Sequence, residues 1–401
     1  MTADEIWAQE SGSNLINNGR KEQYDGGAYY GSEQPKSSKK KWWWIGGAIL
    51  LAAIIAGVVA GVVVSQNNKK NNGSGSSGSG GSGSGGGSGG DFTKDDRLHK
   101  VFWGMAYDPE GAVPPMCGAK QSEVTKDIQI LSQLTTRLRL YSANCNVTAL
   151  VMQAIKDTGV NMTVYPAIYV NQDDTIFTYQ MNNLTDAISK YGADMVDGIA
   201  VGNEYMLNQV GSSTSGAAYN TALKYLSDRI ERFNTTLQGM GLSKHIPVGT
   251  GDAGSVFSVA LAEKIDFFMS NVHPWFGELP AAQAAKWTWS YFDEHNVQVA
   301  AQATNKPNMY LAETGWPTSA NETKFMTLGG AQAGMSDLQS EQWHTCSNTY
   351  VCEANANGTE YFYFEGFDQP WKEQYGGVEP YWGLFDKDRN LKQPLTIPTC
   401  Q

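Results

Sequence analysis

The chain has 401 residues, of which 41% are hydrophobic and 17% are charged, with 44 Gly, 12 Trp and five Cys. This composition excludes an intrinsically disordered protein and a small disulfide-rich scaffold, and the length allows more than one domain. The net charge of −11 repels polyanions, so nucleic acid is not expected as a partner and a neutral or cationic ligand is favoured.

The N-terminal part of the chain predicts a membrane anchor. Residues 1–41 are polar with balanced charge and predict a disordered cytoplasmic tail, whereas residues 42–64 carry no charge. A helix of this length covers the ~30 Å hydrocarbon layer of a membrane. More lysines precede it (Lys36, Lys39, Lys40, Lys41) than follow it (Lys69, Lys70). We therefore expect a single-pass type II signal-anchor in the plasma-membrane lipid. The alternative is a cleaved signal peptide, whose apolar core normally lies nearer the N-terminus.

A tether follows the predicted membrane helix. Within that helix, small residues recur at Ala53, Gly57 and Gly61, a spacing that could support a weak homodimer. Residues 65–100 are predicted to be a linker, because residues 73–90 contain only Gly and Ser and cannot bury apolar surface. We expect this linker to connect the membrane to an extracellular domain, residues 101–401.

Cysteines and sequons agree with an extracellular domain. All five Cys follow the apolar segment, and their odd number leaves at least one without a partner in the chain. If Cys346 and Cys352 share a helix, their Cα atoms are ~9 Å apart, too far for a disulfide. Six sequons predict glycosylation of this domain, at Asn146, Asn161, Asn183, Asn234, Asn321 and Asn357.

From Val101 onward, short β-branched or aromatic runs alternate with amphipathic helical patterns. The eight runs are residues 101–107, 137–141, 162–169, 198–202, 246–250, 266–272, 309–313 and 360–364. Two of the helical patterns are Val124, Ile128, Leu131, Leu134 and Leu223, Leu226, Ile230, Phe233, Leu237. Eight strand–helix units in about 300 residues predict an α/β fold, a (β/α)8 TIM barrel.

A doubly wound open sheet is the competing fold. Residues 249–254, GTGDAG, match the GxGxxG pattern of dinucleotide-binding proteins. The match follows the fifth run rather than the first, and the next run ends in Asn271 where a ribose would require an acidic residue. We therefore expect an ordinary strand-to-helix turn at this position.

Two glutamates stand where a barrel carries its reactive groups, at the C-terminal ends of strands. Glu204 follows the fourth run and Glu313 ends the seventh. A carboxylate at the end of a buried strand is energetically costly unless it is paired with another group or has a catalytic role. For each glutamate considered alone, a salt bridge to a neighbour at the rim is the alternative to a catalytic role. Two of them at one rim fit the cleavage of a glycosidic bond, in which one carboxyl protonates the leaving oxygen and the other meets the positive charge at the anomeric carbon.

Other chemistries find little support. The five His are scattered without an HExxH motif and no GxSxG is present, so neither a metal nor a cofactor is expected. His273 ends the sixth run and is expected to hydrogen-bond a catalytic carboxylate. Aromatic residues also follow the strand ends, and they predict a carbohydrate groove, with rim packing as the alternative. They are Tyr107, Tyr141, Tyr169, Tyr205, Trp275, Phe276, Trp316, Trp371 and Tyr381.

Several segments resemble glycoside hydrolase family 17, the fungal endo-β-1,3-glucanases and related glucanosyltransferases of cell walls. They are GNEYM, AETGWPT, RLYSANCN, NVHPWF, YFYFEGFDQPWK and YWGLF, and the resemblance covers nearly all of residues 101–401. The chain is most similar to the membrane-anchored fungal endo-β-1,3-glucanases. The resemblance implies a retaining mechanism on β-1,3-glucan, with Glu204 as acid/base and Glu313 as nucleophile.

The resemblance also implies roles for further residues. Asn203 would bind the sugar 2-hydroxyl, and a supporting set would orient the nucleophile and the sugar: Tyr107, Tyr141, Glu365 and Lys372. It implies the disulfides Cys117–Cys145 and Cys352–Cys400, which leave Cys346 unpaired. Retaining carboxyl groups stand ~5 to 5.5 Å apart, and Glu313 is expected to raise the pKa of Glu204.

Three functions remain open at this point. The first is hydrolysis of cell-wall β-1,3-glucan, internally or from chain ends. The second is transfer of the cleaved chain to another sugar, and the third is glucan binding by a non-catalytic membrane tether.

Overall fold

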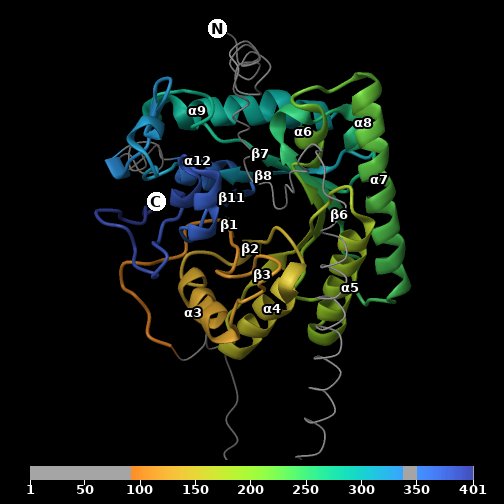
Figure 1. The fold of residues 1–401 in the computed structure, drawn as a ribbon, viewed down its shortest axis with the longest axis horizontal. Coiled ribbons are helices and arrows are strands. Elements are labelled where there is room, and N and C mark those ends of the chain that lie inside the picture. The colour runs from red at the N-terminus through yellow and green to blue at the C-terminus, as the bar shows by residue number, and fades with distance from the viewer. Residues whose placement is uncertain (1–91, 337–349, 401) are drawn as a thin grey trace, which may run out of the picture. The chain divides into compact units, whose positions relative to one another are not determined.

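The computed structural model describes residues 92–336 and 350–400, and within them the main sheet is a ring of parallel strands (Figure 1). The strand order is β3-β2-β1-β11-β8-β7-β6-β5-β4. The strands are β1 (Gly104–Ala106), β2 (Arg137–Arg139), β3 (Thr163–Tyr165), β4 (Ala167–Ile168), β5 (Ile199–Asn203), β6 (Val248–Ala253), β7 (Phe267–Asn271), β8 (Asn308–Thr314) and β11 (Tyr361–Tyr363).

The sheet closes on itself at a proline. Its two end strands, β3 and β4, are separated in sequence by Pro166 alone. Proline has no backbone N–H, so it interrupts the ladder while its carbonyl still accepts from Ala200 N at 3.0 Å. Because β3 and β4 belong to one run of chain, the ends of the sheet meet and eight runs form a barrel. All eight predicted strands are present, and they form a nearly closed parallel barrel that is consistent with the predicted TIM-barrel fold.

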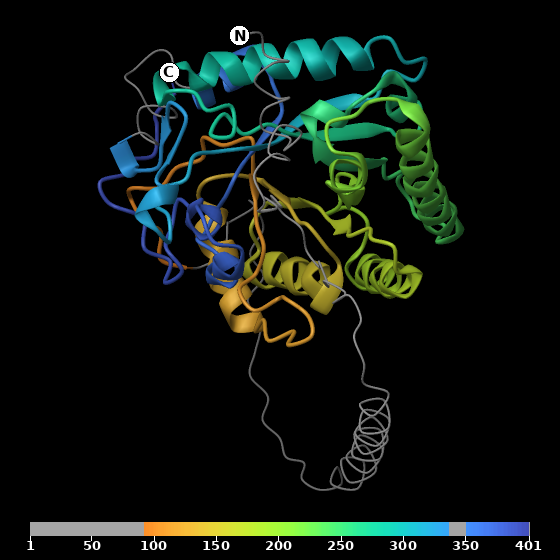
Figure 2. The same cartoon turned by 45° about the horizontal axis from the view of Figure 1, so that its top comes forward.

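Helices lie outside the ring of strands (Figure 2). They are α3 (Gln121–Leu131), α4 (Val147–Thr158), α5 (Asp174–Tyr191), α6 (Tyr205–Val210), α7 (Gly216–Gly239), α8 (Val259–Ala262), α9 (Ala281–Phe292), α10 (Gln298–Ala300) and α12 (Tyr350–Asn357). The predicted apolar stripe of α7 is buried from Leu223 to Leu237, as an amphipathic helix on a sheet requires. Helix α3 ends at Leu131, so the predicted helical pattern was wrong at Leu134, whose carbonyl accepts from Val101 N and Phe102 N at 3.1 Å.

Short irregular elements complete the fold. A two-stranded antiparallel sheet, β9 (Thr327–Leu328) with β10 (Ala331–Gln332), follows β8. The 3-10 helices are η1 (Asn144–Asn146), η2 (Gly254–Val256), η4 (Thr323–Phe325), η5 (Pro370–Tyr375) and η6 (Glu379–Tyr381), and a π-helical turn, η3 (Asp293–Val297), connects α9 to α10.

The interior of the barrel is divided into an apolar and a polar part. Its apolar core contains Tyr165, Ala167, Ala200, Phe267, Met269, Tyr310, Ala312 and Phe362, all buried. Side chains alternate along a strand, so on β7 the side chains of Phe267 and Met269 lie on the same face as Asn271, two residues further on. The polar groups therefore gather beyond the apolar core, at the carboxyl ends of the strands.

Two disulfides are present, and they are the two that the family resemblance implies. Cys117 and Cys145 join the segments that follow β1 and β2. Cys352 of α12 is joined to Cys400 near the C-terminus. Cys346 lies outside the described residues.

The predicted anchor, residues 42–64, lies outside the described residues, as do the tail and the Gly/Ser stretch. Within residues 92–336 and 350–400, no helix combines the length and apolarity needed to cross a membrane. Hydrogen bonds join the end of the predicted linker to the folded domain: Asp95 N donates to Gln133 Oε1 at 2.8 Å, and His99 Nε2 lies 2.7 Å from the carbonyl oxygen of Pro398.

Candidate active site

Two strand irregularities precede the residues of interest. Between β7 and β8, Ser270 pairs with Leu311 but Asn271 pairs with Glu313, so β8 contains one extra residue. Between β5 and β6, Ala200 pairs with Gly249 and Asn203 with Gly251, again with one extra residue in β5. An extra residue reverses the alternation of side chains beyond it. The bulges thereby bring Asn203 and Glu313 into one cluster with Asn271.

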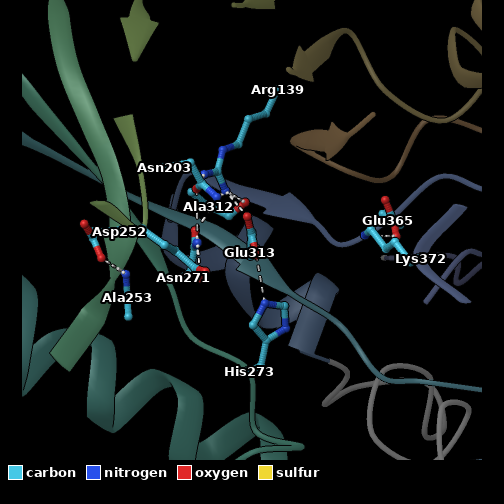
Figure 3. A network of polar contacts seen from close by, with 11 residues as sticks. Arg139, Asn203, Asp252, Ala253, Asn271, His273, Ala312, Glu313, Glu365 and Lys372 are labelled. Atoms are coloured by element: carbon cyan, nitrogen blue, oxygen red, sulfur yellow. Dashed lines mark hydrogen bonds and ion pairs between the residues drawn. The ribbon is translucent and has the colours of Figure 1, made fainter. Parts of the chain in front are cut away.

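Arg139 lies at the centre of this cluster (Figure 3). Its guanidinium is 2% exposed and donates from Nη1 to Asn271 Oδ1 at 2.9 Å, to Ala312 O at 2.8 Å and to Glu313 Oε1 at 3.0 Å. From Nη2 it donates to Asn203 Oδ1 at 2.8 Å. A buried cation is stable only when it is paired and hydrogen-bonded, and these four acceptors meet that condition.

Glu313 is held as an anion. Burial alone would raise the pKa of its carboxyl, but the charge of Arg139 and a contact of 3.0 Å from His273 Nε2 to Oε2 outweigh burial. The buried Lys372 adds to this effect, so the pKa of Glu313 is lowered. Figure 3 shows Glu313 between Arg139 and His273, and the hydrogen bond expected of His273 is confirmed.

Glu204 is held as an acid. It is 6% exposed, and burial together with the negative charge of Glu313 raises the pKa of its carboxyl well above the ordinary value. A hydrogen bond of 3.0 Å from Asn271 Nδ2 to Oε1 and the charge of Arg139 oppose this shift without reversing it. The side chain of Asn271 therefore connects to both glutamates, directly to Glu204 and through Arg139 to Glu313.

The two carboxyl groups thus have pKa shifts in opposite directions. A pair with one protonated and one ionised carboxyl is the electrostatic requirement for a general acid beside a nucleophile. Both side chains retain a small exposed fraction, 6% for Glu204 and 5% for Glu313. No group of His, Cys, Asp and Glu suited to a metal ion occurs in the part of the chain that the structure describes.

A second charged group lies at the same end of the barrel. Lys372 Nζ donates to Glu365 Oε1 at 3.1 Å, and Gln369 donates to the other oxygen of Glu365. Burial raises the pKa of Glu365 to about 7 and that of Glu379 to about 7, although Lys372 opposes both shifts. Glu365 and Lys372 therefore lie near enough to Glu313 for their charges to interact with its carboxyl group.

Tyr141 also faces the nucleophile candidate. Burial and the negative charge of Glu313 raise the pKa of its hydroxyl. The guanidinium of Arg139 lies 4.7 Å from the centre of the Tyr141 ring. This position agrees with the orienting role that the resemblance implies for Tyr141.

Four of the predicted site residues make other contacts in the structure. The hydroxyl of Tyr107 donates to Asp127 Oδ2 at 2.7 Å. Tyr205 stacks on Tyr225 of α7 at 5.4 Å, which makes it a packing residue between helices. Trp316 is fully buried and Trp275 is 2% exposed, with their rings edge-to-face at 5.6 Å. Neither indole offers a free face to a sugar, because strand-end position does not determine on which side a ring packs.

Partly exposed aromatic rings remain at Phe276, Trp371 and Tyr381. Four sequon asparagines are exposed (Asn146, Asn161, Asn321, Asn357), and Asn234 is half-buried. Asn183 is half-buried, and its Nδ2, the atom that would carry a glycan, donates to Ala143 O at 3.0 Å. This bond disfavours glycosylation at Asn183.

Comparison with known proteins identifies the family of this chain. The family described as the BtgE/BtgC glycoside hydrolase domain matches residues 104–383, which include both glutamates and the complete ring of strands. The chain belongs to this family. The BtgE/BtgC domain thus accounts for most of the described residues.

Curated relatives are longer than this chain. The btgC protein of Aspergillus niger is 36% identical over 318 residues, which are 76% of this chain and 44% of that protein. The glucan endo-1,3-beta-glucosidase btgC of Emericella nidulans is 36% identical over 319 residues, which are 76% of this chain and 47% of that protein. The chain therefore matches just under half the length of these relatives.

A solved structure shares the fold. It is a Rhizomucor miehei β-1,3-glucanosyltransferase of glycoside hydrolase family 17, which is 24% identical and covers 75% of this chain and 98% of its own, with a TM-score of 0.59. An active-site mutant of the Rhizomucor miehei β-1,3-glucanosyltransferase, in complex with laminaritriose, gives a TM-score of 0.60 at 23% identity. At these identities the likeness supports the barrel fold.

Proposed function

We propose that this protein is a retaining endo-β-1,3-glucan hydrolase that acts on cell-wall glucan, with Glu204 as acid/base and Glu313 as nucleophile. One observation carries the proposal: Arg139 and Asn271 connect two buried carboxyl groups whose pKa values are shifted in opposite directions. The named relative from Emericella nidulans, a glucan endo-1,3-beta-glucosidase, supports the substrate class.

In the first step, the Glu313 carboxylate attacks the anomeric carbon and forms a glycosyl ester. The bond from that carbon to the leaving oxygen breaks, and the proton of Glu204 moves to that oxygen. Asn203 Oδ1 accepts from Arg139 and Asn271, which fixes the amide, and its Nδ2 donates to no protein group among the described residues. We propose that this Nδ2 binds the sugar 2-hydroxyl, where a hydrogen bond strengthens as charge develops.

In the second step, Glu204 is ionised and accepts a proton from an incoming hydroxyl. If water enters, its oxygen attacks the anomeric carbon, the ester bond to Glu313 breaks, and the chain is hydrolysed. If a sugar hydroxyl enters, the same electron movements lengthen an acceptor chain. A tether without activity would need neither a proton on Glu204 nor a charge on Glu313, and the electrostatics of this site argue against that alternative.

Product analysis on reduced β-1,3-oligosaccharides tests the proposal, with the full chain kept in mild detergent. Internal cleavage products support endo-hydrolysis, and products longer than the starting material would replace it with transfer. Glu313→Gln is expected to remove activity by about 10⁴-fold or more, since both steps depend on this carboxylate. Glucan binding without any released reducing ends in the wild type would refute the enzyme assignment.

We also propose that residues 42–64 anchor the protein in the plasma membrane with the barrel outside the cell. The uncharged segment and the excess of lysines before it support this orientation. The full chain is expected to stay with membranes through alkaline carbonate extraction, and replacing Ile54 and Val58 by Lys should release it. Release of the wild type by carbonate would contradict the anchor.

A further inference from the structure

Most of the GTGDAG segment, residues 249–254, lies in a strand, and the predicted strand-to-helix junction comes only at its last residue. Residues up to Ala253 form the buried strand β6, and only Gly254 lies in the following 3-10 helix. Its central glycine lies close to the site: a Cβ atom on Gly251 would lie 2.8 Å from Nη2 of Arg139 and would displace the guanidinium. The segment therefore lies directly against the site, and its one charged residue, Asp252, takes no part in the mechanism described above.

Asp252 is completely buried, and among the described residues its carboxyl accepts hydrogen bonds from backbone N–H groups alone. Its Oδ2 accepts from Met206 N at 2.7 Å, and its Oδ1 accepts from Leu207 N at 3.2 Å and from Ala253 N at 2.9 Å. Met206 and Leu207 lie in the first turn of α6, which begins immediately after Glu204. The carboxyl group thus fastens the start of α6 to β6.

The backbone of Glu204 needs such support. Its φ of 52° lies in the left-handed region, which is strained for a non-glycine residue and persists where the surroundings impose it. On one side, Glu204 N donates to Gly251 O at 3.0 Å. On the other side, Asp252 holds the second and third residues of the following helix. Together these bonds fix the direction in which the Glu204 side chain leaves the backbone.

We infer that Asp252 is a positioning residue for the acid/base Glu204, which it aims at the leaving oxygen by holding the first turn of α6. Asp252 touches no reacting atom. This inference rests on the proposed function, because it concerns the delivery of the proton in the glycosidic cleavage.

Comparison of two substrates with different leaving groups separates proton delivery by Glu204 from damage to the fold or to Glu313. A sugar leaving group departs as an alcohol and needs the proton of Glu204, whereas 2,4-dinitrophenolate departs as an anion without a proton. The ratio kcat/KM reports the first chemical step for both substrates. Damage to the fold or to Glu313 lowers both values, but a misplaced acid lowers only the value for the oligosaccharide.

The experiment compares variants of the full chain on laminaripentaose and on 2,4-dinitrophenyl β-laminaribioside. Asp252→Asn is expected to lower kcat/KM for the pentaose by about 10- to 100-fold, since misplacing a catalytic group by an ångström has effects of this size. The aryl substrate should keep kcat/KM within about threefold. Asp266→Asn is the matched control, because Asp266 accepts from Val248 N at 2.8 Å at the opposite end of the same strand. It should leave both values near wild type.

Each remaining outcome is decisive. If Asp252→Asn lowers kcat/KM equally for both substrates, or lowers it for neither, the inference is overturned. If that variant does not fold, Asp252→Ser, which keeps a side-chain acceptor, replaces it. Failure of both variants to fold also overturns the inference. The variant Glu204→Gln separates the two proposals. If it lowers kcat/KM equally for both substrates, the acid/base assignment of Glu204 is wrong. If it lowers kcat/KM for the oligosaccharide alone while Asp252→Asn has no effect, only the role of Asp252 is refuted.

Discussion

Removal of the buried cation is the most informative perturbation of this site. Arg139→Met keeps the length and apolar volume of the side chain but leaves Glu313, which is 5% exposed, without its main counter-charge. Breaking a buried ion pair by removing one partner costs about 3–5 kcal/mol. We expect a loss of this size in the free energy of unfolding near neutral pH.

The pH dependence gives this prediction a distinctive sign. In the wild type, the lowered pKa of Glu313 contributes stability above the unfolded pKa near 4.5, and the contribution is lost as pH falls through the folded value. Without Arg139, the largest influence that lowers the pKa of Glu313 is lost, so we expect this pKa to rise. Protonation of Glu313 at acid pH then removes the buried negative charge that destabilises the variant. The difference in stability between variant and wild type should therefore be largest at neutral pH and shrink below about pH 4.5.

Urea unfolding followed by tryptophan fluorescence at several pH values measures this difference. Arg232→Met is the control, because Arg232 pairs with Asp174 on the surface at 2.9 Å, with 40% and 58% of the two side chains exposed. Surface pairs contribute about 0–1 kcal/mol. A destabilisation by Arg139→Met of less than about 1 kcal/mol, or one independent of pH, would refute the role given to this ion pair.

Three further predictions follow from the described contacts. The pH profile of activity should be bell-shaped: its acidic limb, from ionisation of Glu313, should lie below about pH 4.5, and its basic limb, from loss of the Glu204 proton, should lie above about pH 4.5. A profile that is flat from pH 3 to 8 would contradict the assignment. His273→Ala removes a contact to Glu313 and should lower kcat by about 10-fold or more while moving the acidic limb to higher pH, as measured by pH-dependent kinetics. Cys400→Ser opens a bridge to Cys352 over 48 residues and should reduce stability by about 4 kcal/mol in urea unfolding under non-reducing conditions, without changing KM.

The order of residues along the chain was sufficient to predict the barrel and the positions of the two glutamates at its rim. Apolar runs alternating with amphipathic stretches determine parallel strands with helices outside, and a parallel barrel brings the ends of all its strands to one rim. Glu204 and Glu313 follow directly from that rule because each ends or follows a run. The disulfides and the roles of Glu365 and Lys372 came from family resemblance, since spacing alone could not select them.

The tertiary structure alone decided which neighbours each side chain meets. Alternation in RLRLY places Arg137 and Arg139 on one face of β2, but a barrel strand is buried on both faces, so the pattern could not show that Arg139 reaches Glu313. Bulges in β5 and β8 reverse the side of the sheet to which Asn203 and Glu313 point. Packing also buries the ring of Trp316, which was expected to line a carbohydrate groove. These outcomes depend on contacts between distant segments, which a local pattern of residue types does not contain.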